Sequence, residues 1–360
     1  MRLTPLGYAL LIAGHTCACA DRADTPDHGT VTTPPATAGS GGAGGGSAAP
    51  VSGAGGGIDL NIGGTASGGS GAAGGDGDPG KVITSLPPGF TGSELGGYQL
   101  GDSLDAAGAG GSGGAGGGAG ANGNCGNILL GVVRDFKGAD EVSGHPDFEA
   151  EIAGADVTPA LVAQTLGMDR KPVYASKCEM GATPDLTACP YAAQTTSSAR
   201  FGEWYSNVPD VAAPYLISIF LQPQPDGLFS FESLHYFPID GAGFMSMGLE
   251  YTGELHNFGF TTEIHTQFRY RGGEKFTFQG DDDVWVFIND KLAVDLGGLH
   301  AMKRRTVDLD QQAGMLGLTI GTIYPLDLFH AERHTDASTF RIDTNLSFVD
   351  CGTVVPEPVK

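Results

Sequence analysis

Three adjacent carboxylates stand in the segment Gly280-Asp281-Asp282-Asp283, between two strand-like apolar segments. Negative charges this close repel one another, so each needs water, a hydrogen-bond donor or a cation beside it. Calcium accepts about six to eight oxygen ligands in a flexible arrangement, which suits clustered aspartates on a loop. Asp281, Asp282 and Asp283 are therefore candidate calcium ligands. A plain acidic turn is the alternative, because aspartate is common in turns, and the spacing is not that of an EF-hand.

A second group of polar side chains lies in the segment Phe329–His334 (FHAERH). On a strand, His330, Glu332 and His334 would share a face and could bind a transition metal; on a helix, the two histidines would align. The spacing differs from the HExxH motif of zinc peptidases, so a catalytic zinc site is not favoured. A hydrogen-bond cluster is the preferred interpretation, with Glu332, Arg333 and His334 as candidate ligand-binding residues.

A third candidate is the segment Asp295–His300 (DLGGLH). Its paired glycines allow a positive φ or a close approach of the backbone to another group. They lack the lysine and the serine or threonine of a phosphate-binding loop. Asp295 and His300 are therefore candidate ligand-binding residues, although for His300 a role as a cap of its own loop is the preferred interpretation.

The sequence after residue 215 predicts the strands that would position these segments. Apolar and polar residues alternate with a two-residue period, which is typical of strands that bury one face. Val284–Ile288 (VWVFI) is apolar on both faces and predicts a central strand. Gly272-Gly273 and Asn289-Asp290 predict turns. The expected fold is an all-β antiparallel sandwich, and the other strand candidates are residues 264–270, 276–278, 292–296, 316–320, 324–328 and 340–348.

The first third of the 360-residue chain has a different composition. Most of the 60 glycines lie there, among Ala, Ser, Thr and Pro. Such a segment buries too little apolar surface to offset the entropy lost on ordering. Residues 21–124 are therefore predicted to be a disordered linker, and the role of the more apolar residues 81–104 stays open. The β-sandwich domain is expected at 125–351 and a tail at 352–360.

The N-terminus predicts export. Arg2 is followed by the short apolar run Leu6–Ala13 and by Ala18-Cys19-Ala20, a small-residue cleavage pattern. Residues 1–20 are therefore a predicted signal peptide, and the protein is expected to be secreted or at the cell surface. A lipid anchor at Cys17 or Cys19 is the alternative to free secretion. No segment is long and apolar enough to predict a transmembrane helix.

The cysteines predict disulfides, and the net charge limits the kinds of partner that the protein can bind. Removing the signal leaves Cys125, Cys178, Cys189 and Cys351, an even number that suits disulfides in an exported chain. We expect the pairs Cys178–Cys189 and Cys125–Cys351, although other pairings are open. No CxxC spacing indicates zinc. The net charge of −22 disfavours nucleic acid and anionic membranes as partners, because both need cationic patches.

Long strings in the second half resemble the fibro-slime domain family. They are FTFQGDDDVWVFINDKLAVDLGGLH and YPLDLFHAERHTDASTFRIDTNL, with RDF, HPDFE, FGEWY, HYFPIDG and HNFGFTTEIH upstream, and the resemblance covers about residues 127–349. It implies a β-sandwich related to the domain named after anthrax protective antigen, which occurs in adhesins, surface proteins and glycosidase insertions. Lectin-type members hold calcium with two consecutive aspartates, and the ion helps to bind sugar hydroxyls. Asp281 and Asp282 match that pair by order, whereas Asp283 stands where those lectins often have a small residue.

Three functions follow from these observations. The first is a non-enzymatic adhesion protein that binds carbohydrate or an extracellular-matrix polymer with the help of calcium, where Trp285 or Tyr324 could pack on a sugar. For Trp285, burial in the core is the preferred interpretation, because it lies inside an all-apolar strand. The second is a structural component of an extracellular slime, without a small-molecule ligand. The third, a glycoside hydrolase with two carboxylates, is disfavoured because no catalytic motif accompanies the acids.

Overall fold

The computed structural model describes residues 58–59, 84–92, 94–104, 126–150, 156–176, 193–335 and 337–354. The predicted signal peptide, the possible anchors Cys17 and Cys19, most of the predicted linker and Cys125, Cys178 and Cys189 lie outside these ranges. In the ranges that are described, no helix is long and apolar enough to cross a membrane. Cys351 is disulfide-bonded. Its expected pairing with Cys125, like the pair Cys178–Cys189, stays a prediction.

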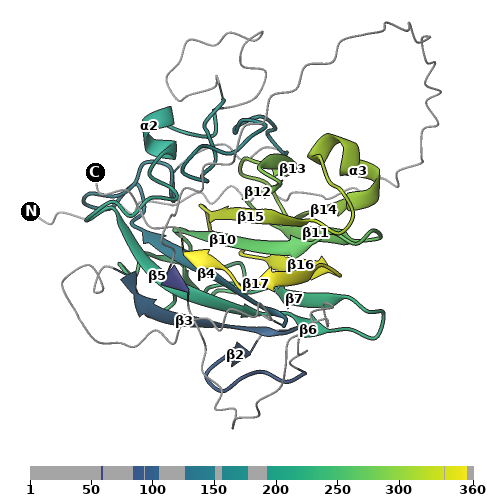
Figure 1. The fold of residues 1–360 in the computed structure, drawn as a ribbon. Helices are drawn as coiled ribbons and strands as arrows, with labels where there is room; N and C mark the ends of the chain where they lie inside the picture. Colours follow the sequence, from purple (N-terminus) through teal and green to yellow (C-terminus); the bar gives the residue numbers. More distant parts are fainter. Residues whose placement is uncertain are drawn as a thin grey trace, which may run out of the picture. The chain divides into compact units, whose positions relative to one another are not determined.

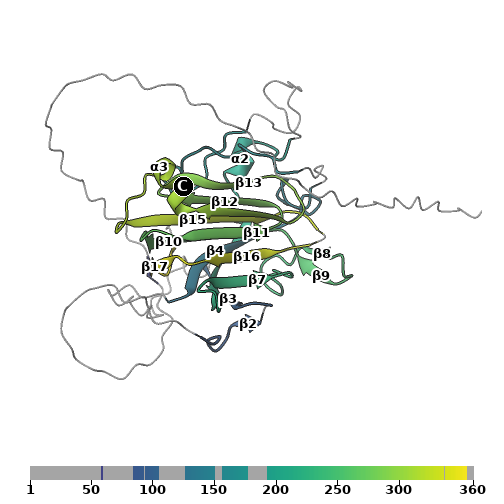
Figure 2. The same cartoon turned by 90° about the vertical axis from the view of Figure 1, so that its right-hand side faces the viewer.

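Two antiparallel sheets form the body of the protein, so the predicted all-β sandwich is confirmed (Figures 1 and 2). The larger sheet has nine strands in the order β13-β12-β15-β10-β4-β5-β3-β2, and β17 also pairs with β10. Their bounds are β2 (Thr91–Gly92), β3 (Gly97–Ser103), β4 (Ile128–Phe136), β5 (Ala212–Phe220), β10 (Phe260–Arg269), β12 (Asp283–Ile288), β13 (Lys291–Leu296), β15 (Ile323–Glu332) and β17 (Ser347–Asp350).

The smaller sheet has five strands in the order β14-β11-β16-β7-β6. Their bounds are β6 (Gln222–Pro223), β7 (Phe229–Ser233), β11 (Lys275–Gly280), β14 (Lys303–Asp308) and β16 (Phe340–Thr344). Two further strand pairs are the hairpin β8 (Met247–Leu249) with β9 (Leu255–Asn257), and β1 (Ile58–Asp59) with β18 (Thr353–Val354).

The main core lies between the two sheets. Alternate residues of both inner faces meet in one buried cluster, which includes Ile264 and Leu328 from the large sheet and Phe278 and Phe340 from the small one. The predicted central strand is β12, which pairs with β13 on one side and β15 on the other. The two-residue alternation of the sequence therefore corresponds to real inward and outward faces.

A second apolar cluster covers the outer face of the large sheet. Segments 156–176 and 193–211, with α2 (Ser198–Phe201), pack Trp204 and Leu161 against Trp285 and Phe329 of the sheet. Trp285 is fully buried, which confirms its core assignment. These two segments therefore form a layer over the sheet.

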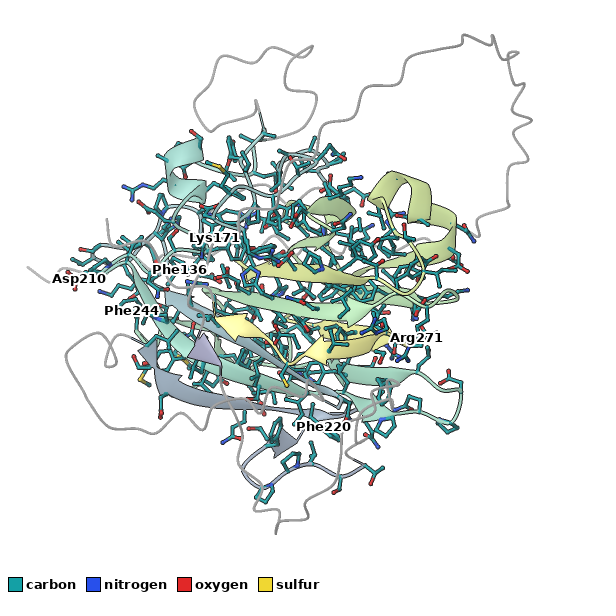
Figure 3. All side chains as sticks on the ribbon, in the orientation of Figure 1. Phe136, Lys171, Asp210, Phe220, Phe244 and Arg271 are labelled. Atoms are coloured by element: carbon teal, nitrogen blue, oxygen red, sulfur yellow. The ribbon has the colours of Figure 1, made fainter. Side chains whose placement is uncertain are left out.

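Buried charges fasten this layer. Glu263 on β10 accepts hydrogen bonds from Arg134 Nη1 at 2.5 Å and contacts Lys171 Nζ of the covering segment at 3.3 Å (Figure 3). His265 contacts Glu263 at 2.7 Å and Asp327 at 2.6 Å, one carboxylate at each ring nitrogen. Burial opposes the charged ring, but the two carboxylates outweigh it and raise the pKa of His265.

Two segments differ from the sequence expectation. β3 lies in the range predicted as linker, yet it pairs with β5, so the large sheet extends N-terminally beyond residue 125. The alternation of Leu316, Leu318 and Ile320 is not a strand. Helix α3 (Leu309–Leu316) begins after the N-cap Asp308 and ends at Gly317, whose φ is 73°.

Candidate ligand-binding site

Antiparallel pairing brings the candidate residues to one end of the sandwich. Gly280, the last residue of β11, pairs with Phe340, the first of β16, and Phe340 also pairs with Ser233 at the end of β7. Asp283, the first residue of β12, pairs with Ala331 near the end of β15. Figure 2 shows the β8–β9 hairpin at this same end. We call it the loop end; it comprises residues 137–149, 234–259, 281–282, 297–302 and the described residues of 333–339.

Asp283 is an ion-pair partner inside the protein. Its Oδ2 atom accepts a hydrogen bond from Arg333 Nε at 2.5 Å, and its Oδ1 atom accepts one from the Gly298 amide at 2.6 Å. Both charged side chains are fully buried. A buried carboxylate that has a cation and an amide beside it needs no further ion. The contacts of Asp283 therefore differ from those of its two neighbours.

Asp281 and Asp282 form the turn between β11 and β12. Asp281 Oδ1 accepts a hydrogen bond from the Thr339 amide at 2.6 Å, and Asp282 Oδ2 accepts one from the Arg333 amide at 2.9 Å. Asp282 has a φ of 52°, a conformation that is uncommon for a residue with a side chain. The two residues are only 7% and 6% exposed, so both side chains are largely shielded from water.

Glu332 supplies a third carboxylate beside this turn. It is fully buried, and neither of its carboxylate oxygens makes a hydrogen bond of normal geometry within the described ranges, although Ser338 and Asp282 are neighbours. A buried polar atom without a partner loses its interaction with water and gains nothing in return. A buried carboxyl with so few favourable contacts, such as Glu332, is unusual for a residue whose role is only to stabilise the fold.

The electrostatic consequence is a group of carboxyls that resist ionisation. Burial raises the pKa of Asp281 to about 7, and the charge of Asp282 adds to the effect. Burial also raises the pKa of Asp282 against the opposing influence of Arg333. The pKa of Glu332 lies well above its ordinary value because of burial and of both aspartates. Protons or a cation must compensate the charge at this place.

Arg333 joins the loop end to the covering layer. Its Nη1 atom donates to the carbonyl oxygens of Asp147 and Gln194 at 3.3 and 2.9 Å, and its guanidinium lies 4.6 Å from the ring centre of Trp204. It is 1% exposed, so its contacts are structural. His334, the next residue, is exposed and contacts the Thr335 carbonyl oxygen.

The third sequence candidate also reaches the loop end. The ring nitrogens of His300 contact the carbonyl oxygens of Ala301 and Leu296 at 3.0 and 3.2 Å, which matches a cap of its own loop. Asp295 accepts hydrogen bonds from Trp285 Nε1 at 3.2 Å and from the Ala160 amide at 2.9 Å. It therefore ties the covering segment to β13.

His330 does not share a site with His334. Its ring is fully buried among the rings of Tyr236, Phe260, Phe278 and Phe340, and burial lowers its pKa to about 3. Within the ranges described, no three Asp, Glu, His or Cys side chains converge as a metal site. A transition-metal site of the strand type considered from the sequence is therefore not formed.

Sequence reasoning missed part of the loop end. Glu149 accepts a hydrogen bond from the Thr335 amide at 2.8 Å, and burial raises its pKa. Tyr251, at the tip of the β8–β9 hairpin, is exposed beside His235. The turn segment Glu250–Glu254 is the only part of this hairpin that the sequence could have indicated. Strands β8 and β9 are three residues each, too short to show an alternating pattern.

With this geometry in view, comparison with known proteins shows what part of the chain resembles. Residues 250–358 match the model of the PA14 domain, a β-sandwich domain of carbohydrate-binding and adhesion type. The match includes the turn at Asp281-Asp282 and the strand that carries Glu332. It agrees with the wider protective-antigen group to which the sequence resemblance pointed, while membership of the fibro-slime family itself stays a prediction.

Particular relatives come from Dictyostelium discoideum. The chain is 41% identical over 214 residues to protein psiD, 41% over 216 residues to protein psiR and 39% over 210 residues to protein psiC. These alignments cover 58%, 57% and 56% of this chain but only 40%, 20% and 38% of the relatives. The chain therefore spans at most about two fifths of their length. A solved isomalto-dextranase from Arthrobacter globiformis T6 aligns over 59% of this chain and 34% of its own with 10% identity and a TM-score of 0.18, too low to relate the folds.

Proposed function

We propose that this protein is an extracellular, non-enzymatic binding protein that holds a carbohydrate or a matrix polymer at the loop end, with calcium at Asp281 and Asp282. The observation that carries the proposal is the crowding of three buried carboxyls, Asp281, Asp282 and Glu332, all of which have raised pKa values. The PA14 match supports the binding class, because that domain is of the carbohydrate-binding and adhesion type.

Calcium fits the donor set better than a transition metal would. The side chains that face one another are carboxylates, and hard cations prefer oxygen ligands. Asp281 and Asp282 would be the protein ligands, with Glu332 adding negative charge behind them. Asp283 is not needed, since Arg333 already compensates it. Calcium would supply a centre at which sugar hydroxyls replace water.

A binding role rather than an enzymatic one agrees with the burial of these acids. Asp281 and Asp282 are held by backbone amides of Thr339 and Arg333, and Glu332 is closed off from solvent. General acid–base chemistry on a glycosidic bond needs two carboxyls that reach the substrate from opposite sides. The location outside the cell rests on the predicted export signal, with the lipid anchor as its alternative form.

The proposal is tested with the full chain at pH 8, with calcium or with a chelator. Calcium should raise the melting temperature of the wild type, by the equivalent of about 3 kcal/mol at a hundredfold excess over Kd. Asp281→Asn with Asp282→Asn should abolish this rise. In chelator the double variant should be at least as stable as the wild type, because it removes repulsion. Asp226→Asn, an exposed acid in the β6–β7 turn away from the loop end, is the control.

Glycan retention is the second readout. A panel of hexopyranose-terminated oligosaccharides should be retained by the wild type in calcium and released by chelator. If calcium does not change the melting temperature of the wild type, the proposed calcium site is refuted. Retention of no oligosaccharide and no matrix polymer would favour the alternative, a structural slime component without a ligand.

A further inference from the structure

Tyr251 is the single Phe, Tyr or Trp side chain that is exposed in the ranges the structure describes, and 66% of it is accessible. The rings that the sequence offered for sugar packing are not available, since Trp285 is fully buried and Tyr324 is 9% exposed. An aromatic ring left open to water gives up a large hydrophobic contribution to stability. Its position at a hairpin tip at the loop end therefore needs a reason.

The ring of Tyr251 is backed by an imidazole. His235 lies beside it with ring centres 6.4 Å apart and planes 21° from parallel. His235 Nδ1 contacts the buried Glu250 Oε1 at 2.6 Å, and Glu250 Oε2 accepts a hydrogen bond from Thr252 at 2.5 Å. The Glu250 amide also donates to the Glu254 carbonyl oxygen at 2.8 Å. The pair is therefore held in place, and a surface fixed in advance loses less entropy on binding.

This pair adjoins the acidic turn. His235 forms a parallel β-bridge with Ser338, and the next residue, Thr339, donates its amide to Asp281 at 2.6 Å. On the hairpin side, a Cβ atom built on Gly248 would lie 2.0 Å from Thr335 Cγ2, so strand β8 packs directly on the segment after β15. The described part of 333–339 thus contacts both Asp281 and the hairpin.

We propose that Tyr251, backed by His235, is the packing face for a hexopyranose unit of the glycan bound at Asp281 and Asp282. This inference depends on the proposed function. It assigns to the Tyr251 ring the selection of ligands that have an apolar face. A pyranose presents a face of C–H groups and a rim of hydroxyls. The C–H face packs on the phenol ring, as apolar surfaces of ligands do on aromatic side chains. The carboxylate of Glu254, which is 77% exposed, is a hydroxyl acceptor three residues away.

The test uses the full chain in calcium with the same panel of hexopyranose-terminated oligosaccharides, followed by titration with the one retained. Tyr251→Ala should weaken binding about tenfold, the loss of one aromatic contact. Tyr251→Phe keeps the ring and should bind within about twofold of the wild type. Ile320→Ala is the matched control, because Ile320 is 68% exposed and lies at the opposite end of the sandwich. Melting curves verify that each variant is folded.

The outcomes separate the two proposals. If the wild type binds, the Asp281 and Asp282 variant does not, and Tyr251→Ala binds like the wild type, the packing face is refuted and the proposed function stands. If Tyr251→Phe binds as weakly as Tyr251→Ala, the hydroxyl rather than the ring face makes the contact, and the inference is wrong. If the wild type retains no oligosaccharide, the proposed function fails and this inference fails with it.

Discussion

Asp135 allows the electrostatics of the loop end to be measured apart from any ligand. It is the last but one residue of β4 and is fully buried. Its carboxylate accepts hydrogen bonds from the Phe244 amide and from Asn257 Nδ2, the latter at 2.9 Å, and so ties the β8–β9 region to the large sheet. Phe244 and Phe136, the neighbour of Asp135, are labelled in Figure 3. Burial raises the pKa of Asp135 from 3.8 to about 7.

The change Asp135→Asn should stabilise the protein at neutral and alkaline pH. A folded-state pKa above the unfolded one means that the folded state holds the extra proton, so stability is lost as pH rises from about 4 through 7. Each pKa unit corresponds to about 1.4 kcal/mol, so the difference of about three units costs the wild type about 4 kcal/mol above pH 7. The amide removes this cost. Asn257 Oδ1 is buried without a partner among the described residues and can accept the new N–H once its own amide turns over.

The assay is urea unfolding of both proteins in chelator at a series of pH values. The variant should gain about 3 kcal/mol relative to the wild type between pH 5 and pH 8, and the difference should then stay constant. Asp226→Asn, in the β6–β7 turn, controls for the loss of one exposed charge away from the loop end. A difference that is the same at pH 5 and pH 8, or one that favours the wild type as pH rises, would refute the reasoning.

Three further changes test single contacts of the fold, two at the loop end and one in the β12–β13 turn at the opposite end of β12. Arg333→Met leaves the Asp283 carboxylate buried without its cation and should cost about 3–5 kcal/mol in urea unfolding, with an unchanged midpoint refuting the ion pair. Gly248→Ala places a methyl group against Thr335 and should cost about 1–3 kcal/mol; full stability would show that the hairpin does not pack there. Asp290→Gly relieves a φ of 59° in the β12–β13 turn and should raise stability by about 0.5 kcal/mol, whereas a loss would contradict the assigned turn.

The strands were predictable where apolar and polar residues alternate. On β10, Ile264 and Phe268 face the sandwich core, but the predicted wet face is wrong, because Glu263 and His265 are buried under the covering layer. The uniformly apolar Val284–Ile288 is covered on both faces. Asn289 and Asp290 both have positive φ, as the predicted tight turn requires. These features are local, so the pattern of residue types carries them.

Features that depend on distant pairing were not predictable. The high glycine content of Gly97–Ser103 argues against a strand, yet the edge of β5 accepts it, because backbone hydrogen bonds do not require large side chains. In α3, alternation at Leu316 and Leu318 suggested a strand, although the caps Asp308 and Gly317 carried the correct signal. Local periodicity is weak where a segment is short, and terminal residues then decide its structure.

The sequence predicted which segments contribute to the site, but not which of their side chains contact one another. The acidic turn and the segment after β15 were both identified, but their contact depends on Asp283 pairing with Ala331, which no residue pattern specifies. That register gives Arg333 to Asp283 and leaves Glu332 facing the other two aspartates. The three adjacent aspartates therefore have different surroundings in the structure, although their residue type and spacing could not distinguish them.

Carboxyls with raised pKa values gather at one end of the fold. Among the described groups, the raised ones all lie in or next to the loop end: Asp135, Glu149, Asp281, Asp282, Asp295 and Glu332. Lowered pKa values are spread more widely: Glu263 and Asp343 pair with arginines, whereas Asp156 pairs with Lys303, which directly follows residues 297–302. A raised pKa destabilises the empty protein, and stability is commonly given up where a ligand later restores it. The concentration of such groups at one end, beside the one exposed aromatic ring described, therefore argues for ligand binding at the loop end and against an acidic surface that serves only solubility.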